Sequence, residues 1–277
     1  MPAADALEAD LALLQDLALL KDVAREAGEL ALDWLRSGAK SWDKSANNPV
    51  TEADLAVNDL IAKRLRGARP EYGWLSEETR DNPADRTQDK VWVVDPIDGT
   101  KAFVKGDTGF CVSIARVDNG EPSLGVIYNP NFNELLHARL HGGAFLNDRP
   151  IRTTASAKLG CRMVGQPDVF AAADAAQRWP GMKLISPMPN AVAWRMCLVA
   201  AGRWDAAVAL NPKNDWDLAA AVLLVSEAGG IATDRDGKRL VFNQASVIQR
   251  GVVAAGAALH PLIMERLHNY PASQDPK

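Results

Sequence analysis

An apolar run ends in two closely spaced aspartates in the segment Val91-Trp92-Val93-Val94-Asp95-Pro96-Ile97-Asp98-Gly99-Thr100. Consecutive apolar residues before the first aspartate predict a buried strand that stops there. The proline fixes its own φ and turns the chain, while the glycine lets another part of the backbone approach closely. We therefore expect both carboxylates at the end of one strand, followed by a short helix over residues 100–104.

This strand end has two chemical interpretations. In the first, Asp95, Asp98 and the carbonyl oxygen of Ile97 converge on one or two metal ions, and the amides of the following helix meet an anion. In the second, the two carboxylates serve only the backbone, as an Asx-turn and a helix cap. The segment by itself does not separate a metal site from a structural turn.

The part of the chain around this strand predicts helices beside an antiparallel sheet. Apolar residues at helical spacing indicate a long amphipathic helix over 13–34 and a second helix over 51–65. The polar segment 44–50 between them predicts a turn. Further apolar runs at hairpin-like separations predict strands at 110–117, 123–128 and 134–140.

After Ile151 helix and strand patterns alternate, as is typical of α/β proteins. Helices are expected at 168–178, 191–201, 217–228 and 259–269, and strands at 183–186, 204–210 and 251–255. No repeat, low-complexity tract or flexible linker separates the two halves. We therefore expect one domain over 1–277 of the α/β (α+β) class, with lobes at about 1–150 and 151–270.

Composition excludes several classes of protein. The chain has 277 residues, 47% hydrophobic and 24% charged, which excludes a disordered or fibrous protein. Its three cysteines form no C-x-x-C pair, and a net charge of -4 gives no general attraction to nucleic-acid phosphates. The longest uncharged stretch, 251–264, is too short to span a bilayer, and the acidic N-terminus is unlike a secretory signal. We expect a cytoplasmic protein with no membrane span and no nucleic-acid partner.

Three more acidic residues stand at the ends of predicted elements. Asp54 follows Thr51 by three positions, which is capping-box spacing, and Glu77 follows the short apolar element 72–75. Asp217 stands at the start of a predicted helix, where an aspartate commonly caps. Taken singly, each of these carboxylates also has a purely structural interpretation.

Taken together, these segments resemble the inositol monophosphatase superfamily of magnesium-dependent, lithium-sensitive phosphatases. The matching segments are Lys44-Ser45, Pro49-Val50-Thr51-Glu52-Ala53-Asp54, Ser76-Glu77-Glu78, residues 92–100, Trp216-Asp217, Ala219-Ala220 and Glu227-Ala228-Gly229-Gly230. The combination of D-P-I-D-G-T with a distant W-D is highly specific, and the segments span residues 44–230. The resemblance implies a layered αβαβα sugar-phosphatase fold with the site between the two lobes.

The resemblance also implies a set of metal ligands. One Mg²⁺ is expected on Glu77, Asp95 and the Ile97 carbonyl, and a second on Asp95, Asp98 and Asp217. A third, weaker ion near Glu77 is allowed. Carboxylate and carbonyl oxygens suit Mg²⁺. His137 and His141 are expected on the surface, so no histidine cluster competes for zinc.

The catalytic residues that the resemblance implies are Asp54, Glu77 and Thr100. Asp54 and Thr100 match the pair that orients and deprotonates the water that attacks phosphorus in line, while the second ion stabilises the leaving alkoxide. No covalent phosphoenzyme is implied, and a homodimer is expected. The aspartyl-phosphate enzymes of the haloacid dehalogenase type are excluded, because their two aspartates are spaced D-x-D and those of this chain are spaced D-x-x-D. The glycines of 251–256 lack the Lys-Ser/Thr of a nucleotide-binding loop.

The substrate is expected to be a small phosphorylated metabolite, for which three classes compete: inositol phosphates, histidinol phosphate and nucleoside 3',5'-bisphosphates. Inositol phosphatases usually carry a glutamate about seven residues before the last aspartate, where this chain reads Ala209-Leu210-Asn211-Pro212-Lys213-Asn214-Asp215. The missing glutamate and the length of 202–217 resemble the bacterial 3'(2'),5'-bisphosphate nucleotidases. The best candidate substrate is therefore 3'-phosphoadenosine 5'-phosphate, with inositol 1-phosphate or histidinol phosphate as the alternative.

The residues expected to contact the substrate lie in three segments. They are Asp98, Gly99, Thr100, Lys101, Arg195 and Lys213. The three basic side chains offer positive charge to a second phosphate, although each also has an interpretation as solvated surface charge. A different class of function is a catalytically silent regulatory or RNA-associated protein. The occupied ligand positions and the negative net charge disfavour that class.

Overall fold

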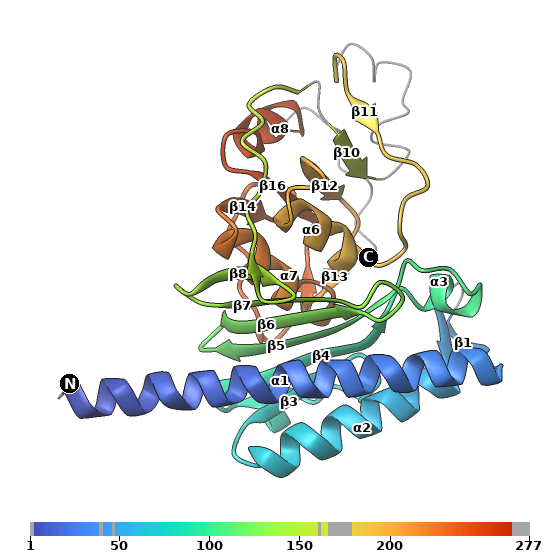
Figure 1. Ribbon diagram of the computed structural model, residues 1–277, viewed down its shortest axis with the longest axis vertical. Coiled ribbons are helices and arrows are strands. Elements are labelled where there is room, and N and C mark those ends of the chain that lie inside the picture. Colours follow the sequence, from blue (N-terminus) through green and yellow to red (C-terminus); the bar gives the residue numbers. More distant parts are fainter. Residues whose placement is uncertain (1–2, 39–40, 46–47, 160–161, 166–178, 268–277) are drawn as a thin grey trace.

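The computed structural model describes residues 3–38, 41–45, 48–159, 162–165 and 179–267 (Figure 1). Its layers run from two helices, α1 (Ala3–Ser37) and α2 (Glu52–Ala68), through a seven-stranded sheet to a middle layer of helices. A five-stranded sheet and the helix α8 (His260–Leu267) complete the stack. The predicted α/β class and its αβαβα layering are therefore confirmed. None of the helices in the described ranges is both long and apolar enough to cross a membrane.

The seven-stranded sheet has its strands in sequence order from β3 to β9. Its strands are β3 (Gly73–Ser76), β4 (Lys90–Asp98), β5 (Cys111–Asp118), β6 (Glu121–Asn129), β7 (Glu134–Arg139), β8 (Gly143–Leu146) and β9 (Arg149–Pro150). All neighbouring pairs are antiparallel except β3 and β4, which are parallel. The 3₁₀ helix η1 (Pro83–Arg86) lies in the connection between those two strands.

The five-stranded sheet has the order β11-β10-β12-β16-β14. Its strands are β11 (Lys183–Leu184), β10 (Arg162–Gly165), β12 (Ala206–Ala209), β16 (Val252–Gly256) and β14 (Gly230–Thr233). The helices α6 (Val192–Ala200) and α7 (Asp215–Glu227) form the middle layer between the two sheets. Two small pairs complete the fold: β1 (Ser41–Ser45) with β2 (Asn48–Thr51), and β13 (Lys213–Asn214) with β15 (Ile248–Gln249).

Strand β4 is apolar at every position before Asp95 except its first because both faces of its sheet are covered. Trp92 and Val94 pack in the cluster under α1 and α2, whereas Val91 and Val93 pack in the cluster under α6 and α7. Side chains alternate between the two faces of a strand, so a strand covered on both sides needs no polar face. Burying each large apolar side chain contributes about 1.5–3 kcal/mol, which holds the strand end in place for the polar residues that follow.

Helix α7 approaches the sheet closely enough to depend on one glycine. A Cβ atom added at Gly125 on β6 would lie 2.8 Å from the carbonyl oxygen of Ala220. Any larger residue there would push α7 away from the sheet. The position of α7 matters because Asp217 lies in its first turn.

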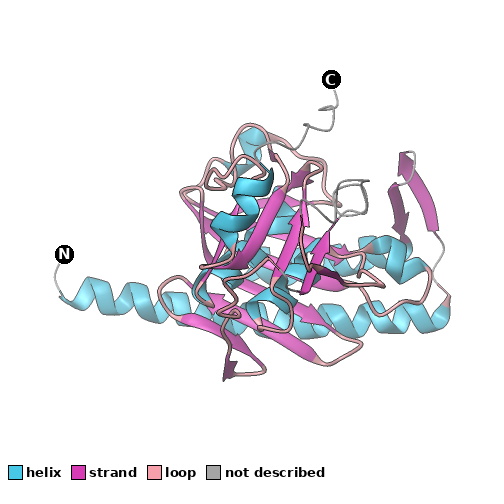
Figure 2. Ribbon diagram, turned by 90° about the horizontal axis from the view of Figure 1, so that it is seen from above, coloured by secondary structure: helices cyan, strands magenta, loops and turns pink. Residues whose placement is uncertain are grey.

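Several predicted elements agree with the structure and others need correction. The short helix α3 (Thr100–Val104) has the expected bounds. Most of the segment 44–50, predicted as a turn, belongs to the β1–β2 pair, which backbone hydrogen bonds hold together; in Figure 2 this hairpin projects at the end of α1. The predicted helix 168–178 lies outside the described residues. Strand β14 was not predicted, because its four residues show no alternation of apolar and polar side chains.

The expectation of a surface position for His137 is wrong. This residue lies on β7, is 7% exposed and stacks on Phe145 with ring centroids 5.1 Å apart. Its Nε2 lies 2.9 Å from an Asp148 carboxylate oxygen. The side chain is enclosed because β7 is an inner strand of a sheet that α1 covers. His141 is exposed, as expected.

Candidate active site

The ends of β3 and β4 bring the first two carboxylates together. The two strands are parallel with Ser76 opposite Val94, and the Glu77 N–H donates to the Val94 carbonyl at 3.2 Å. Glu77 directly follows β3, and Asp95 directly follows Val94 within β4. Because neighbouring parallel strands end at the same edge of a sheet, these side chains become neighbours there.

A bulge at the end of β4 places Asp98 on the same side as Asp95. The pairing with β5 shifts between Asp95, opposite Ser113, and Asp98, opposite Cys111. Residues three apart on a regular strand point to opposite faces, and one extra residue restores the same face. The Ile97 N–H donates to an Asp95 carboxylate oxygen at 3.1 Å, so the Asx-turn predicted at Asp95 is present.

Gly99 allows the bulge to lead directly into α3. Its φ of +94° lies in the left-handed region, and an added Cβ would lie 2.9 Å from the Gly109 carbonyl oxygen and 3.0 Å from the Ala191 nitrogen. Both contacts are with backbone atoms, which do not rotate out of the way. Only glycine fits this position without strain.

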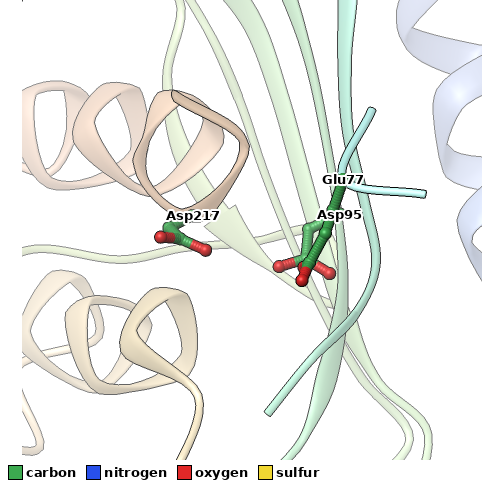
Figure 3. A group of neighbouring side chains, drawn as sticks. All are labelled: Glu77, Asp95 and Asp217. Atoms are coloured by element: carbon green, nitrogen blue, oxygen red, sulfur yellow. The ribbon is translucent and has the colours of Figure 1, made fainter. Parts of the chain in front are cut away.

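The third carboxylate comes from α7. Asp217 lies in the first turn of this helix and one of its oxygens accepts from the Asn214 N–H at 2.8 Å, as part of a capping box. Glu77, Asp95 and Asp217 each have a carboxylate oxygen within 4.8 Å of the others' (Figure 3). Asp95 is buried, and the other two are half-buried. Three elements far apart in sequence therefore meet at one point.

Asp98 caps a helix other than the one that directly follows it in the sequence. Its carboxylate does not cap α3, whose N-cap residue is Gly99 and which has no side-chain cap. One Asp98 oxygen instead accepts from the Ala193 N–H at 2.7 Å, in the first turn of α6. Helix α6 begins after Ala191, which has no side-chain acceptor of its own. Asp98 thus caps a helix on the opposite side of the site.

The four carboxylates disfavour one another's ionisation. Burial, followed by the charge of the nearby Asp217 carboxylate, raises the pKa of Asp98 to about 7. Burial, followed by the charges of Glu77, Asp98, Asp217 and Asp54, raises the pKa of Asp95 well above its usual range. Burial also raises the pKa of Asp217. A cluster of this kind becomes fully ionised when a cation is bound among its oxygens.

Asp54 and Thr100 meet beside this cluster. The Asp54 Oδ2 accepts from the Thr51 N–H at 2.8 Å and from the Thr51 hydroxyl at 2.5 Å, so the capping box at the start of α2 is present. Its Oδ1 lies 3.2 Å from the Thr100 hydroxyl, which is also 3.2 Å from the Ile97 carbonyl. One oxygen of Asp54 thus holds the helix and the other faces the predicted catalytic threonine.

The three predicted basic contacts lie in different surroundings. Lys101 is exposed on α3. Arg195 is 8% exposed, and its guanidinium donates to the carbonyls of Pro189 at 2.7 Å and Asn190 at 2.6 Å. Lys213 is half-buried on β13, and its charge lowers the pKa of both Asp98 and Asp217. The charge of Arg195 also lowers the pKa of Asp98, whereas the charge of Lys213 lowers the pKa of both carboxylates.

The donor set fits Mg²⁺. All its side-chain oxygens are carboxylates, and the Ile97 carbonyl adds a neutral hard oxygen beside them. No nitrogen or sulfur ligand belongs to the described cluster. Glu77, Asp95 and Asp217 could hold a metal ion. Asp98 does not belong to that group of three, but it and the Ile97 carbonyl lie at the same strand end and could add further oxygens.

The sequence model of the inositol monophosphatase family matches residues 13–272. The chain belongs to this family. An inositol-1-monophosphatase of Mesorhizobium japonicum is 35% identical over 233 residues, 78% of this chain and 83% of the relative. A histidinol-phosphatase of Chlorobaculum parvum is 33% identical over 242 residues, 86% of this chain and 90% of the relative. The predicted family and the predicted class of magnesium-dependent phosphatase are therefore confirmed.

Solved structures agree with the family. The extragenic suppressor protein SuhB of Bartonella henselae superposes with a TM-score of 0.81 at 28% identity, covering 92% of this chain and 99% of that protein. Its fold is thus matched over nearly the whole of both chains.

Proposed function

We propose that this phosphatase hydrolyses a substrate that carries a second phosphate, with 3'-phosphoadenosine 5'-phosphate as the best candidate. The observation that carries the proposal is the position of Lys213. Lys213 lies in the segment where the inositol enzymes usually carry a glutamate, and its positive charge lowers the pKa of Asp98 and Asp217. A cation attracts a second phosphate, whereas the glutamate would accept hydrogen bonds from ring hydroxyls.

The remaining carboxylate of this segment is not directed to the substrate. Asp215 is fully buried, and its two oxygens accept from the Asn243 N–H and the Gln249 side-chain amide, each at 2.7 Å. It therefore does not replace the missing glutamate. Leu210 is 7% exposed and offers no polar group.

The chain's own residues supply orientation and proton transfer. When bound, Mg²⁺ supplies positive charge that polarises the phosphoryl group and acidifies water. The Thr100 hydroxyl donates to Asp54 Oδ1, which leaves its lone pairs to accept from a water. This water is thereby aimed at phosphorus, and its proton passes through the hydroxyl toward the Asp54 carboxylate. The N–H groups at the start of α3 would bind phosphate oxygens.

The test is a comparison of kcat/KM for 3'-phosphoadenosine 5'-phosphate, inositol 1-phosphate and histidinol phosphate. The bisphosphate should be the best substrate of the parent. Lys213→Ala should lose about 10- to 150-fold on the bisphosphate, since one charge-assisted contact contributes roughly 1.5–3 kcal/mol, and much less on the monophosphates. Lys101→Ala and Arg195→Ala test the other two cations. Lys63→Ala, an exposed lysine of α2, is the matched control.

Two results would contradict the substrate assignment. A preference of tenfold or more for inositol 1-phosphate would overturn it. Equal losses of Lys213→Ala on all three substrates would show that this charge serves the common phosphate or the fold. The named activities of the two curated relatives favour inositol 1-phosphate and histidinol phosphate as the second candidates.

A further inference from the structure

A buried arginine lies in the connection that carries Glu77. Arg86, the last residue of η1, has a side chain that is only 2% exposed. Its Nε and Nη2 donate to the two oxygens of Asp81, at 2.7 Å and 3.0 Å. This ion pair folds the β3–β4 connection back on itself, within ten residues of Glu77.

The same guanidinium also reaches the segment that follows β14. Its Nη1 donates to the Asn243 side-chain oxygen at 2.9 Å and to the Gln244 carbonyl at 2.8 Å. In return, the Asn243 side-chain amide donates to the Arg86 carbonyl at 3.2 Å. Arg86 and Asn243 are 157 positions apart in sequence, so these bonds join two distant parts of the chain.

Asn243 in turn is bound to the start of α7. Its N–H donates at 2.7 Å to Asp215, the first residue of this helix. The Asp215 N–H donates to the Val247 carbonyl at 2.8 Å, which fixes the helix start to the same segment. Asp217 follows two residues later. A continuous path of hydrogen bonds therefore connects the support of Glu77 with the support of Asp217.

We propose that Arg86 is a positioning residue, which sets the separation of Glu77 and Asp217 by cross-linking the β3–β4 connection to the start of α7. The inference rests on the proposed metal site. Glu77 and Asp217 come from different layers of the fold, and their like charges push them apart at a separation within 4.8 Å. Mg²⁺ tolerates little deviation from octahedral geometry, so a looser pair of ligands binds it more weakly.

The experiment measures Mg²⁺ binding by calorimetry without substrate, together with unfolding of the metal-free protein by urea. Arg86→Met keeps an unbranched apolar stem in place of the aliphatic part of the arginine and removes the guanidinium with its hydrogen bonds. Arg116→Met is the matched control, because Arg116 is also buried (5% exposed side chain) and paired with two aspartates, Asp16 and Asp118, neither of which is a proposed metal ligand. Both variants should lose stability. Only Arg86→Met should raise the Kd for Mg²⁺ tenfold or more, with the control within threefold of the parent.

A second variant approaches the same link from the other side. Asn243→Ala should weaken Mg²⁺ binding as Arg86→Met does, and the double variant should be no weaker than the poorer single variant, since both remove one path. Arg86→Lys should restore part of the affinity. If Arg86→Met does not fold, Asn243→Ala and Arg86→Lys carry the test.

An unchanged Mg²⁺ Kd in Arg86→Met and Asn243→Ala would overturn the inference, as would an equal loss in Arg116→Met. In both cases the parent would still bind Mg²⁺, and the proposed function would stand. Failure of the parent itself to bind Mg²⁺ would overturn both.

Discussion

Asp98→Asn should make the metal-free protein more stable while it abolishes phosphatase activity. The substitution keeps the shape of the side chain and an oxygen that accepts from the Ala193 N–H, and it removes a negative charge from a buried cluster. Proteins rarely gain stability from a change to an active-site residue unless that residue is held in an unfavourable state. Asp98 meets this condition because its pKa rises to about 7 in the folded protein.

The size and the sign of the effect follow from that pKa. The ordinary value is 3.8, so the folded value is higher by about 3 pH units, and each unit corresponds to ~1.4 kcal/mol. A carboxylate with a raised pKa does not affect the free energy of unfolding below pH 3.8. It lowers that free energy progressively as the pH rises from 3.8 to about 7. The free-energy cost of folding with this carboxylate is then ~4 kcal/mol at pH 8 and ~2 kcal/mol at pH 5.

The assay is urea unfolding of the metal-free parent and variant at both pH values. Asp98→Asn should exceed the parent in stability, and its advantage should be larger at pH 8 by ~2–3 kcal/mol. Excess Mg²⁺ should stabilise the parent more than the variant. A variant less stable than the parent at pH 8, or an advantage that does not change with pH, would refute the argument that burial of this carboxylate opposes folding.

Three further predictions concern the site. Asp95→Asn should lose Mg²⁺-dependent turnover without unfolding. Turnover within about threefold of the parent would contradict the role of Asp95 as a ligand shared by two ions. The control is Glu78→Gln, which is next to the proposed ligand Glu77 and should have a mild effect. Thr100→Val should lower kcat by about 10²–10⁴-fold with little change in the affinity for Mg²⁺, which a steady-state assay with metal titration measures. If the hydroxyl served only the fold, kcat would change little. Lithium should inhibit at millimolar concentration, and phosphate release that is insensitive to lithium at limiting Mg²⁺ would count against this subclass.

Local sequence patterns predicted the elements that depend on nearby residues. The apolar run before Asp95, the glycine at position 99 and the helix 100–104 were all visible because strand burial, a left-handed turn and a helix start each depend on a few consecutive residues. The pairing of Thr51 with Asp54 was also visible as a capping-box spacing, and the structure contains both of its hydrogen bonds.

Other features had no local signal. The bulge that turns Asp98 to the same side as Asp95 depends on the pairing with β5, and the N–H that Asp98 accepts belongs to α6. Arg86 was not predicted to have any role, because its partners Asn243 and Gln244 are more than 150 positions away. His137 was misplaced for the same reason: only the packing of α1 over its sheet encloses it.

The sequence by itself therefore determined the class of chemistry, since the combined segments that carry Glu77, Asp95, Asp98 and Asp217 resemble a family of magnesium-dependent phosphatases. Tertiary structure alone decided which oxygens lie within 4.8 Å of one another and which are directed to helix starts. The physical reason is one of range. Side-chain chemistry and turn geometry are fixed within a few residues, whereas the separation of two charges from different layers depends on how those layers pack and which buried hydrogen bonds join them.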